Sequence, residues 1–159
     1  MTDQEVQDLI GWWIVRTRNL KNKGFHDEFV RFFIYYMCLD AWITHESGED
    51  ADQKKIKWFL GNHNLLKDVF IDVDRSSLGA LKTLSPIKDM RPNKGGKLTS
   101  LSNVNDIGQV IRFIYQIRCN LFHGGKSPAN GKDSDLVFHA GSFLDKWINW
   151  AHLKKVDSF

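Results

Sequence analysis

Apolar residues recur at helical spacing through most of this chain, beginning at its N-terminus. Thr2 and Glu5 fit the S/T-x-x-E pattern that caps a helix, and apolar residues follow them at intervals of three and four. The pattern predicts a first helix that runs to about Leu20 and is ended by residues 22–24. A second helix begins near Asp27 and is so rich in aromatic residues that we expect it to be buried almost all round.

The same spacing predicts further helices along the rest of the chain. The expected helices are a short one over 52–60, weaker pieces over 65–70 and 78–84, a long one capped by Asn105 or Asp106 with a clean apolar stripe, and a last one from about Asp133 to Lys155. Residues 86–99 read as the clearest loop, and residues 69–73 are the only candidate strand. The sequence therefore predicts one all-α domain over residues 1–159, a bundle of four longer helices with short helices inserted between them.

Composition adds only loose limits to this picture. The formal net charge of +3 permits a nucleic-acid partner without requiring one. Cys38 and Cys119 both lie in apolar segments, as buried free thiols of a reducing cytosol do. The N-terminus is acidic and the longest apolar run, residues 32–39, is too short to cross a membrane. We therefore expect a cytoplasmic protein without a membrane segment.

The segment 117–126 contains polar and charged residues that folding alone does not require. Arg118 and His123 fall at the end of the long amphipathic helix, just before Gly124 and Gly125. An arginine matches phosphate oxygens with a planar fork of donors, and a histidine can move a proton near neutral pH. We therefore expect Arg118 to hold a phosphodiester and His123 to act as general base or acid on a ribose 2′-hydroxyl or a leaving oxygen.

Three further residues are candidates for the same site. Asn120 would orient the substrate or fix the imidazole tautomer, and Lys126 would add affinity for phosphate. Asp40 interrupts the apolar second helix and would pair with Arg118, orient His123 or simply lie at the edge of the bundle. The other histidines show no metal-ligand spacing, so neither a metal nor another cofactor is expected. Gly95 and Gly96, with Lys94 and Lys97, lack the strand–loop–helix context of a phosphate-binding loop.

A plainer interpretation of the same residues is a helix cap. Cations near a helix C-terminus satisfy free carbonyls and complement the helix dipole. On an ideal helix, Arg118 and His123 point about 140° apart, because each residue turns the helix by about 100°. The two side chains can therefore meet at one ligand only through a distorted helix end or a second copy of the chain.

The stretch from Tyr115 to Lys126 closely resembles the signature of the HEPN superfamily, in which an arginine is followed after four to six residues by a histidine. The aromatic second helix and the helix after the 126–132 loop are also similar to that family. The resemblance implies a helical bundle, commonly a homodimer whose two signatures face each other. It also implies a metal-independent endoribonuclease of toxin–antitoxin or antiphage defence systems. Arg118 and His123 would then be catalytic, and Asn120 the polar residue between them.

This resemblance leaves more than one function open. In the leading hypothesis the chain cuts single-stranded or loop RNA to a 2′,3′-cyclic phosphate, with an antitoxin or another neighbouring-gene product as its partner. In the alternatives it is a non-catalytic module that binds nucleotide, RNA or a partner protein, or a structural dimerisation domain.

Overall fold

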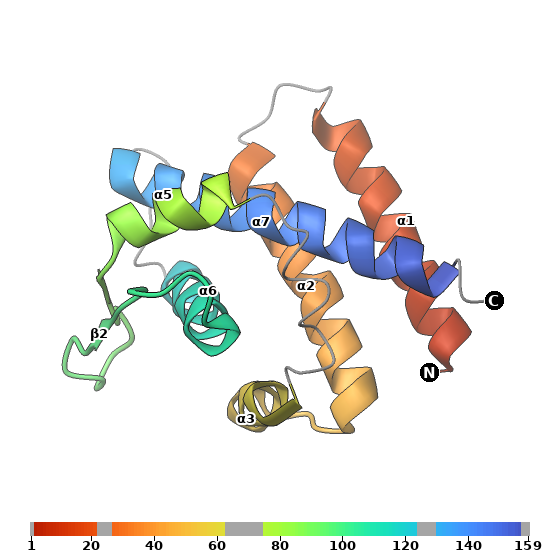
Figure 1. Ribbon diagram of the computed structural model, residues 1–159, viewed down its shortest axis with the longest axis horizontal. Coiled ribbons are helices and arrows are strands. Elements are labelled where there is room, and N and C mark those ends of the chain that lie inside the picture. The colour runs from red at the N-terminus through yellow and green to blue at the C-terminus, as the bar shows by residue number, and fades with distance from the viewer. Residues whose placement is uncertain (1, 22–26, 63–74, 124–129, 157–159) are drawn as a thin grey trace.

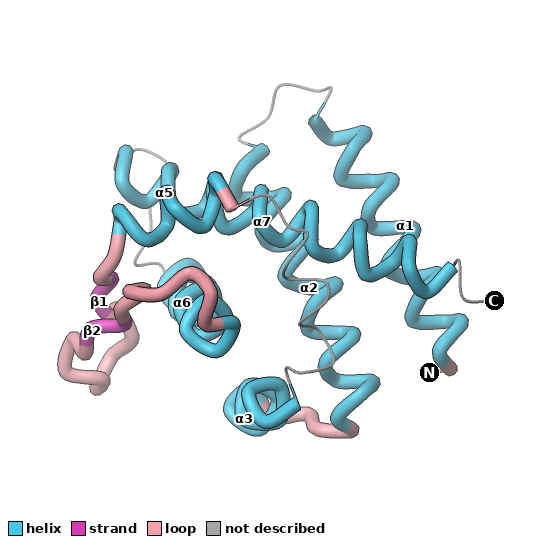
Figure 2. Tube along the Cα trace, in the orientation of Figure 1, coloured by secondary structure: helices cyan, strands magenta, loops and turns pink. Residues whose placement is uncertain are grey.

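The protein is a helical bundle in the computed structural model, which describes residues 2–21, 27–62, 75–123 and 130–156 (Figure 1). The described residues form six helices and one two-stranded hairpin. The helices are α1 (Asp3–Lys21), α2 (Asp27–Ser47), α3 (Asp52–Asn62), α5 (Ser76–Leu84), α6 (Ile107–Phe122) and α7 (Gly131–Val156). Helix dominates the tube trace, and the short strands lie at one edge of the molecule beside α6 (Figure 2). The predicted all-α bundle is confirmed.

The core forms where α2 and α7 pack against each other, and the remaining elements surround this pair. α1 packs along α2 and touches α7, α5 lies on the N-terminal half of α7, and α3 contacts α2 (Figure 1). Large side chains from several helices are fully buried there, among them Phe32, Tyr35, Phe59, Phe113, Ile117 and Phe143. Because these residues are far apart in sequence, the bundle closes only when the whole chain folds.

The start of α1 shows how local sequence sets a helix boundary. The backbone N–H of Glu5 donates to Oγ1 of Thr2 at 3.3 Å, and the backbone N–H of Thr2 donates to Oε2 of Glu5 at 2.6 Å. This reciprocal pair is the predicted capping box, and it satisfies donors that the first turn leaves free. The capping bonds also hold the pKa of Glu5 below its ordinary value, chiefly through the backbone N–H of Thr2.

The prediction that α2 is buried almost all round holds for most of the helix, because only Val30, Met37 and Glu46 are exposed among its described side chains. Met37 is 48% exposed and Val30 is 39% exposed, although Phe32, Tyr35 and Leu39 on the same helix are buried. α1, α3 and α7 pack against α2 from other directions, which leaves the side that carries Met37 toward solvent. The aromatic-rich sequence therefore predicts that this helix is central. It does not predict which side of the helix the neighbouring helices leave exposed.

The segment predicted as a loop over 86–99 contains a hairpin. Strands β1 (Ile87–Lys88) and β2 (Leu98–Thr99) pair antiparallel, with Ile87 opposite Thr99 and Lys88 opposite Leu98. Two-residue strands are too short to show the alternation by which a strand is read from sequence. The helical piece predicted over 65–70 and the candidate strand over 69–73 lie outside the described residues. None of the described helices combines the length and apolar character needed to cross a membrane.

Candidate functional site

α6 positions the candidate residues because one side of it is apolar and the other is not. Its N-terminus is fixed by Asp106, whose side chain accepts a hydrogen bond from the backbone N–H of Gln109 at 3.1 Å. Ile111, Ile114 and Ile117 are then buried as the predicted stripe. Arg118 lies at the edge of that stripe, so its side chain emerges where α6 meets the neighbouring helices.

The Arg118 guanidinium is held between an aromatic surface and one carboxylate. Its central carbon lies 4.4 Å from the ring centre of Phe122, one turn along α6, and 5.7 Å from that of Tyr36 on α2. Nη1 lies 2.8 Å from Oδ2 of Asp52, at the start of α3. Arg118 thus joins its own helix, α6, to α2 and α3, and these contacts fix its position before any ligand arrives.

These contacts keep Arg118 charged without using all of its donors. Burial lowers the pKa of Arg118, but the Asp52 carboxylate and the other neighbours outweigh this, so that its pKa is raised. A guanidinium has five N–H donors. Asp52 lies against Nη1, whereas Nε is buried without a hydrogen-bond partner among the described residues. The group therefore remains a cation, and an anionic ligand can reach only the 22% of its side chain that is exposed, because Nε is buried.

His123 lies at the C-terminal end of α6, away from Arg118. The helix continues to Phe122, and the backbone N–H of His123 donates to the carbonyl of Cys119 at 3.2 Å. The His123 side chain is exposed, and no hydrogen bond or ion pair joins it to Arg118 within the part of the chain that the structure describes. The structure therefore shows no contact between these two described side chains, and His123, with φ of -92° and ψ of 14°, lies just beyond the regular helix.

Asn120 is buried rather than open to a substrate. Its side chain is 0% exposed, and Oδ1 accepts hydrogen bonds from the backbone N–H of Met90 and from Nε2 of Gln116, both at 2.9 Å. Nδ2 donates to the carbonyl of Lys88 at 2.8 Å. Asn120 thus ties the hairpin to α6, and its predicted role of orienting the substrate stays a prediction that this burial disfavours.

A second polar contact orders the residues that follow β1. Nε and Nη2 of Arg91 donate to the two carboxylate oxygens of Asp89, at 2.9 and 2.6 Å. This bidentate bond from Arg91 holds the pKa of Asp89 at about 2, well below its ordinary value. Asp89 is only 6% exposed, so the pair forms a largely buried clasp at the base of the hairpin loop.

Asp40 does not pair with Arg118, so this one of the three alternatives is wrong; its side chain is 38% exposed, as the alternative of an aspartate at the edge of the bundle expects. Its two carboxylate oxygens lie 3.1 and 3.0 Å from Nζ of Lys55 on α3. The Lys55 side chain is only 9% exposed, so the lysine end of this ion pair is buried. The carboxylate that does reach Arg118, Asp52, was missed because 66 residues separate the two in sequence.

Some of the remaining predicted residues belong to the described part of the chain and others do not. Lys126, Gly124 and Gly125 lie outside the described residues. Cys38 and Cys119 are buried free thiols as expected, and burial raises the pKa of Cys38 to about 12.

The burial of Asn120 could have been predicted from the sequence. Asn120 follows Phe113 by seven residues and Ile117 by three, so it falls on the apolar side of α6.

One group of potential metal ligands occurs among the described residues, far from α6. Asp3, His45 and Glu46 bring one ligand atom each to within 4.8 Å of one another. Nε2 of His45 lies 2.5 Å from Oδ1 of Asp3, which joins the start of α1 to the end of α2. This pair places an anion at a helix N-terminus and a potential cation at a C-terminus, so it is explained without a metal.

Comparison with protein-family models, curated proteins and solved structures found no significant match to this chain. The resemblance to the HEPN superfamily therefore rests on the amino-acid sequence alone.

Proposed function

We propose that this chain is a metal-independent endoribonuclease of the HEPN type that cleaves single-stranded or loop RNA. The observation that carries the proposal is the exposed imidazole of His123 at the end of the helix that also presents the charged, preoriented guanidinium of Arg118. An imidazole open to solvent can reach a ligand, and a fixed cation can stabilise charge on a phosphate without reorganising.

The chemistry needs a base, an acid and a phosphate-binding cation. A base takes the proton of the ribose 2′-hydroxyl, whose oxygen attacks the adjacent phosphorus. The bond from phosphorus to the 5′-oxygen then breaks, and an acid gives that oxygen a proton. The products are a 2′,3′-cyclic phosphate and a 5′-hydroxyl. Arg118 would stabilise the negative charge on the phosphoryl oxygens, and His123 would transfer protons.

We further propose that the active form is a homodimer. In one chain no contact among the described residues joins Arg118 to His123, so a partner's copy of the site would bring an arginine and a histidine to the same phosphate. The surface beside Arg118 also suits self-association: Phe122 is 58% exposed and packs edge-on against Phe33, and Met37 lies one turn further along α2. Two imidazoles would then supply the base and the acid.

One observation favours the alternative of a non-catalytic module. The Asp52 carboxylate at 2.8 Å offsets part of the positive charge that Arg118 would offer to a phosphate. A protein that uses this surface only for binding RNA, nucleotide or a protein partner would keep such a pair. A toxin or defence role, with an antitoxin or another neighbouring-gene product as partner, belongs to the proposal and follows from the family resemblance alone.

The decisive experiment is an RNA cleavage assay in EDTA with matched variants. Wild-type protein is expected to cut single-stranded RNA and to leave a 2′,3′-cyclic phosphate, whereas RNA with a 2′-deoxy substitution at the cut site should stay intact. His123→Ala should lose a factor of at least about 10² in rate, the usual contribution of a general acid or base. His139→Ala, a half-buried histidine on α7, is the matched control and should retain activity.

Three outcomes separate the hypotheses. Equal cleavage by wild type, His123→Ala and Arg118→Ala would identify a contaminating nuclease and refute the assignment. Saturable, salt-sensitive RNA binding without any turnover would favour the binding module. If Arg118→Ala loses the dimer and its stability, and neither wild type nor any variant binds RNA, a purely structural domain would be favoured.

A further inference from the structure

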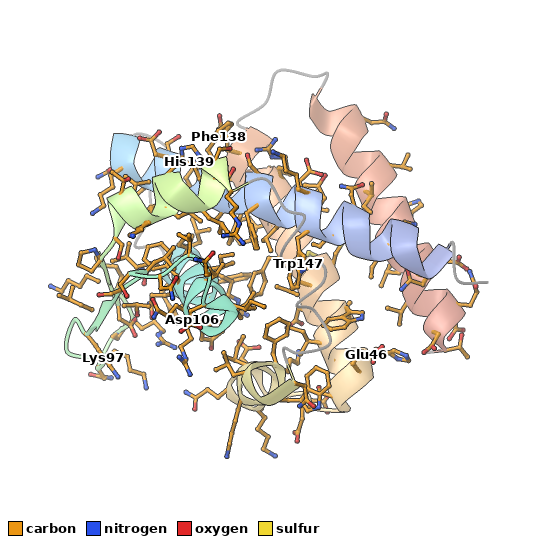
Figure 3. All side chains as sticks on the ribbon, viewed as in Figure 1. Glu46, Lys97, Asp106, Phe138, His139 and Trp147 are labelled. Carbon is orange, nitrogen blue, oxygen red and sulfur yellow. The ribbon has the colours of Figure 1, made fainter. Side chains whose placement is uncertain are left out.

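The hairpin beside α6 concentrates the positive charge of this protein. It comprises β1, β2 and the loop between them, residues 87–99, and we call it the basic arm. The basic arm extends from the bundle next to α6 (Figure 1), and Lys97 lies toward its outer end (Figure 3). Its base is anchored by Ile87, which is 2% exposed.

The charge of the basic arm equals that of the whole chain. Residues 87–99 contain four cations and one anion, a net charge of +3, and the formal net charge of all 159 residues is also +3. The single anion, Asp89, is neutralised by Arg91. Lys88, Lys94 and Lys97 remain, all of them exposed, and none forms an ion pair with another described residue.

Several contacts order the basic arm before any ligand binds. Asn120 holds the backbone of Lys88 and Met90, and the backbone N–H of Asp89 donates to the carbonyl of Lys97 at 2.8 Å. The Lys88 side chain crosses the arm above Gly96, where an added Cβ would lie 2.2 Å from Cε of Lys88. Gly96 also has a φ of +66°, which glycine tolerates best. A preordered surface loses less entropy when it binds.

The basic arm begins close to the candidate catalytic residue. Asn120 bonds to the arm at Lys88 and Met90, and His123 follows Asn120 by three residues on α6. His123 is the C-cap of α6, and Asn120 lies in the last turn of the same helix. The basic arm is therefore joined to the end of α6 that bears His123.

We propose that the basic arm binds the phosphates of single-stranded RNA next to the cleavage site, through Lys88, Lys94 and Lys97. This inference rests on the proposed function and extends it by naming the surface that holds the strand beyond the cut phosphate. Exposed lysines bind backbone phosphates as point charges and read no sequence, so the arm supplies affinity rather than base specificity. Asn120 is then a positioning residue, because it fixes the arm beside His123.

The test compares two triple variants that remove the same charge. Lys88, Lys94 and Lys97 are changed to Gln in the arm variant; exposed lysines on α3, α5 and α7, namely Lys57, Lys82 and Lys146, are changed to Gln in the control variant. Both carry His123→Ala, which prevents cleavage. Binding of a fluorescein-labelled single-stranded RNA of about 15 nucleotides is followed by anisotropy across a salt series. Circular dichroism and urea unfolding verify that both variants fold.

Each outcome supports or overturns the inference. The slope of log K against log salt is expected to fall by about 2 in the arm variant, because each lost single-strand phosphate contact removes about 0.7, and affinity should fall on the order of 10- to 100-fold. The control variant should change affinity by no more than about twofold.

Equal slopes in the two triple variants would overturn the inference about the arm while leaving the ribonuclease proposal intact. Binding of vesicles of anionic phospholipid by the arm, with no arm-dependent RNA binding, would overturn it as well. Failure of the His123→Ala parent to bind RNA at all would refute the proposed function and the arm together.

Discussion

The burial of Asn120 leads to a prediction that separates a structural role from a catalytic one. Asn120→Ala removes three hydrogen bonds, to the N–H of Met90, the carbonyl of Lys88 and Nε2 of Gln116. Each bond contributes about 1 kcal/mol net, and a buried group left without a partner costs about 1–3 kcal/mol. Lys88 and Met90 are themselves exposed, so water can replace part of what their backbone groups lose. We therefore expect a loss of about 2–4 kcal/mol.

The assay is urea unfolding followed by tryptophan fluorescence, supported by a thermal melt. For a chain of this length the expected loss corresponds to a fall in Tm of about 5–15 °C. The matched control is Asn62→Ala at the exposed end of α3, which should change stability by less than about 1 kcal/mol, since Asn62 makes one local bond to the carbonyl of Trp58. Limited proteolysis should also cut Asn120→Ala faster within residues 89–97.

One result would refute this reasoning. If Asn120→Ala unfolds at the wild-type urea concentration but loses RNA cleavage, then Asn120 acts on the substrate and the hydrogen bonds to the hairpin contribute little. If stability and cleavage fall together, and lower temperature or an osmolyte restores cleavage, the structural role is supported.

Two further predictions concern ionic contacts. Asp40→Ala should destabilise the protein by about 1–3 kcal/mol in urea unfolding, because it leaves the buried Lys55 ammonium without its partner, whereas Lys55→Met should be close to neutral; equal losses in both variants would contradict this account. Because the pKa of Asp89 lies at about 2 in the folded protein, below its ordinary 3.8, its contribution is complete above that ordinary value and is lost as pH falls toward 2. Urea midpoints between about pH 5 and about pH 2 should therefore fall more steeply in wild type than in Arg91→Gln, and parallel curves would show that the clasp contributes nothing.

Local sequence is enough to predict the elements whose stabilising contacts lie between neighbours along the chain. The capping box of Thr2 and Glu5, the Asp106 cap of α6 and the apolar stripe of α6 are all local, because their partners lie within a few residues. The all-α class follows from the same helical spacing. The candidate pair Arg118 and His123 was also visible in the sequence, together with the angle that separates the two residues on a helix.

Tertiary structure decided which polar groups meet. The partner of Arg118 is Asp52 and that of Asp40 is Lys55, and only the packing of α3 near α2 and α6 chooses between such carboxylates. The same holds for Asn120, whose amide bonds to a hairpin 30 and 32 residues earlier in the chain. Spacing along a helix fixes the direction in which a side chain points. The partner that it meets there depends on which elements the burial of the apolar core brings close. That packing involves all the helices together, so it cannot be inferred from any one segment of the sequence.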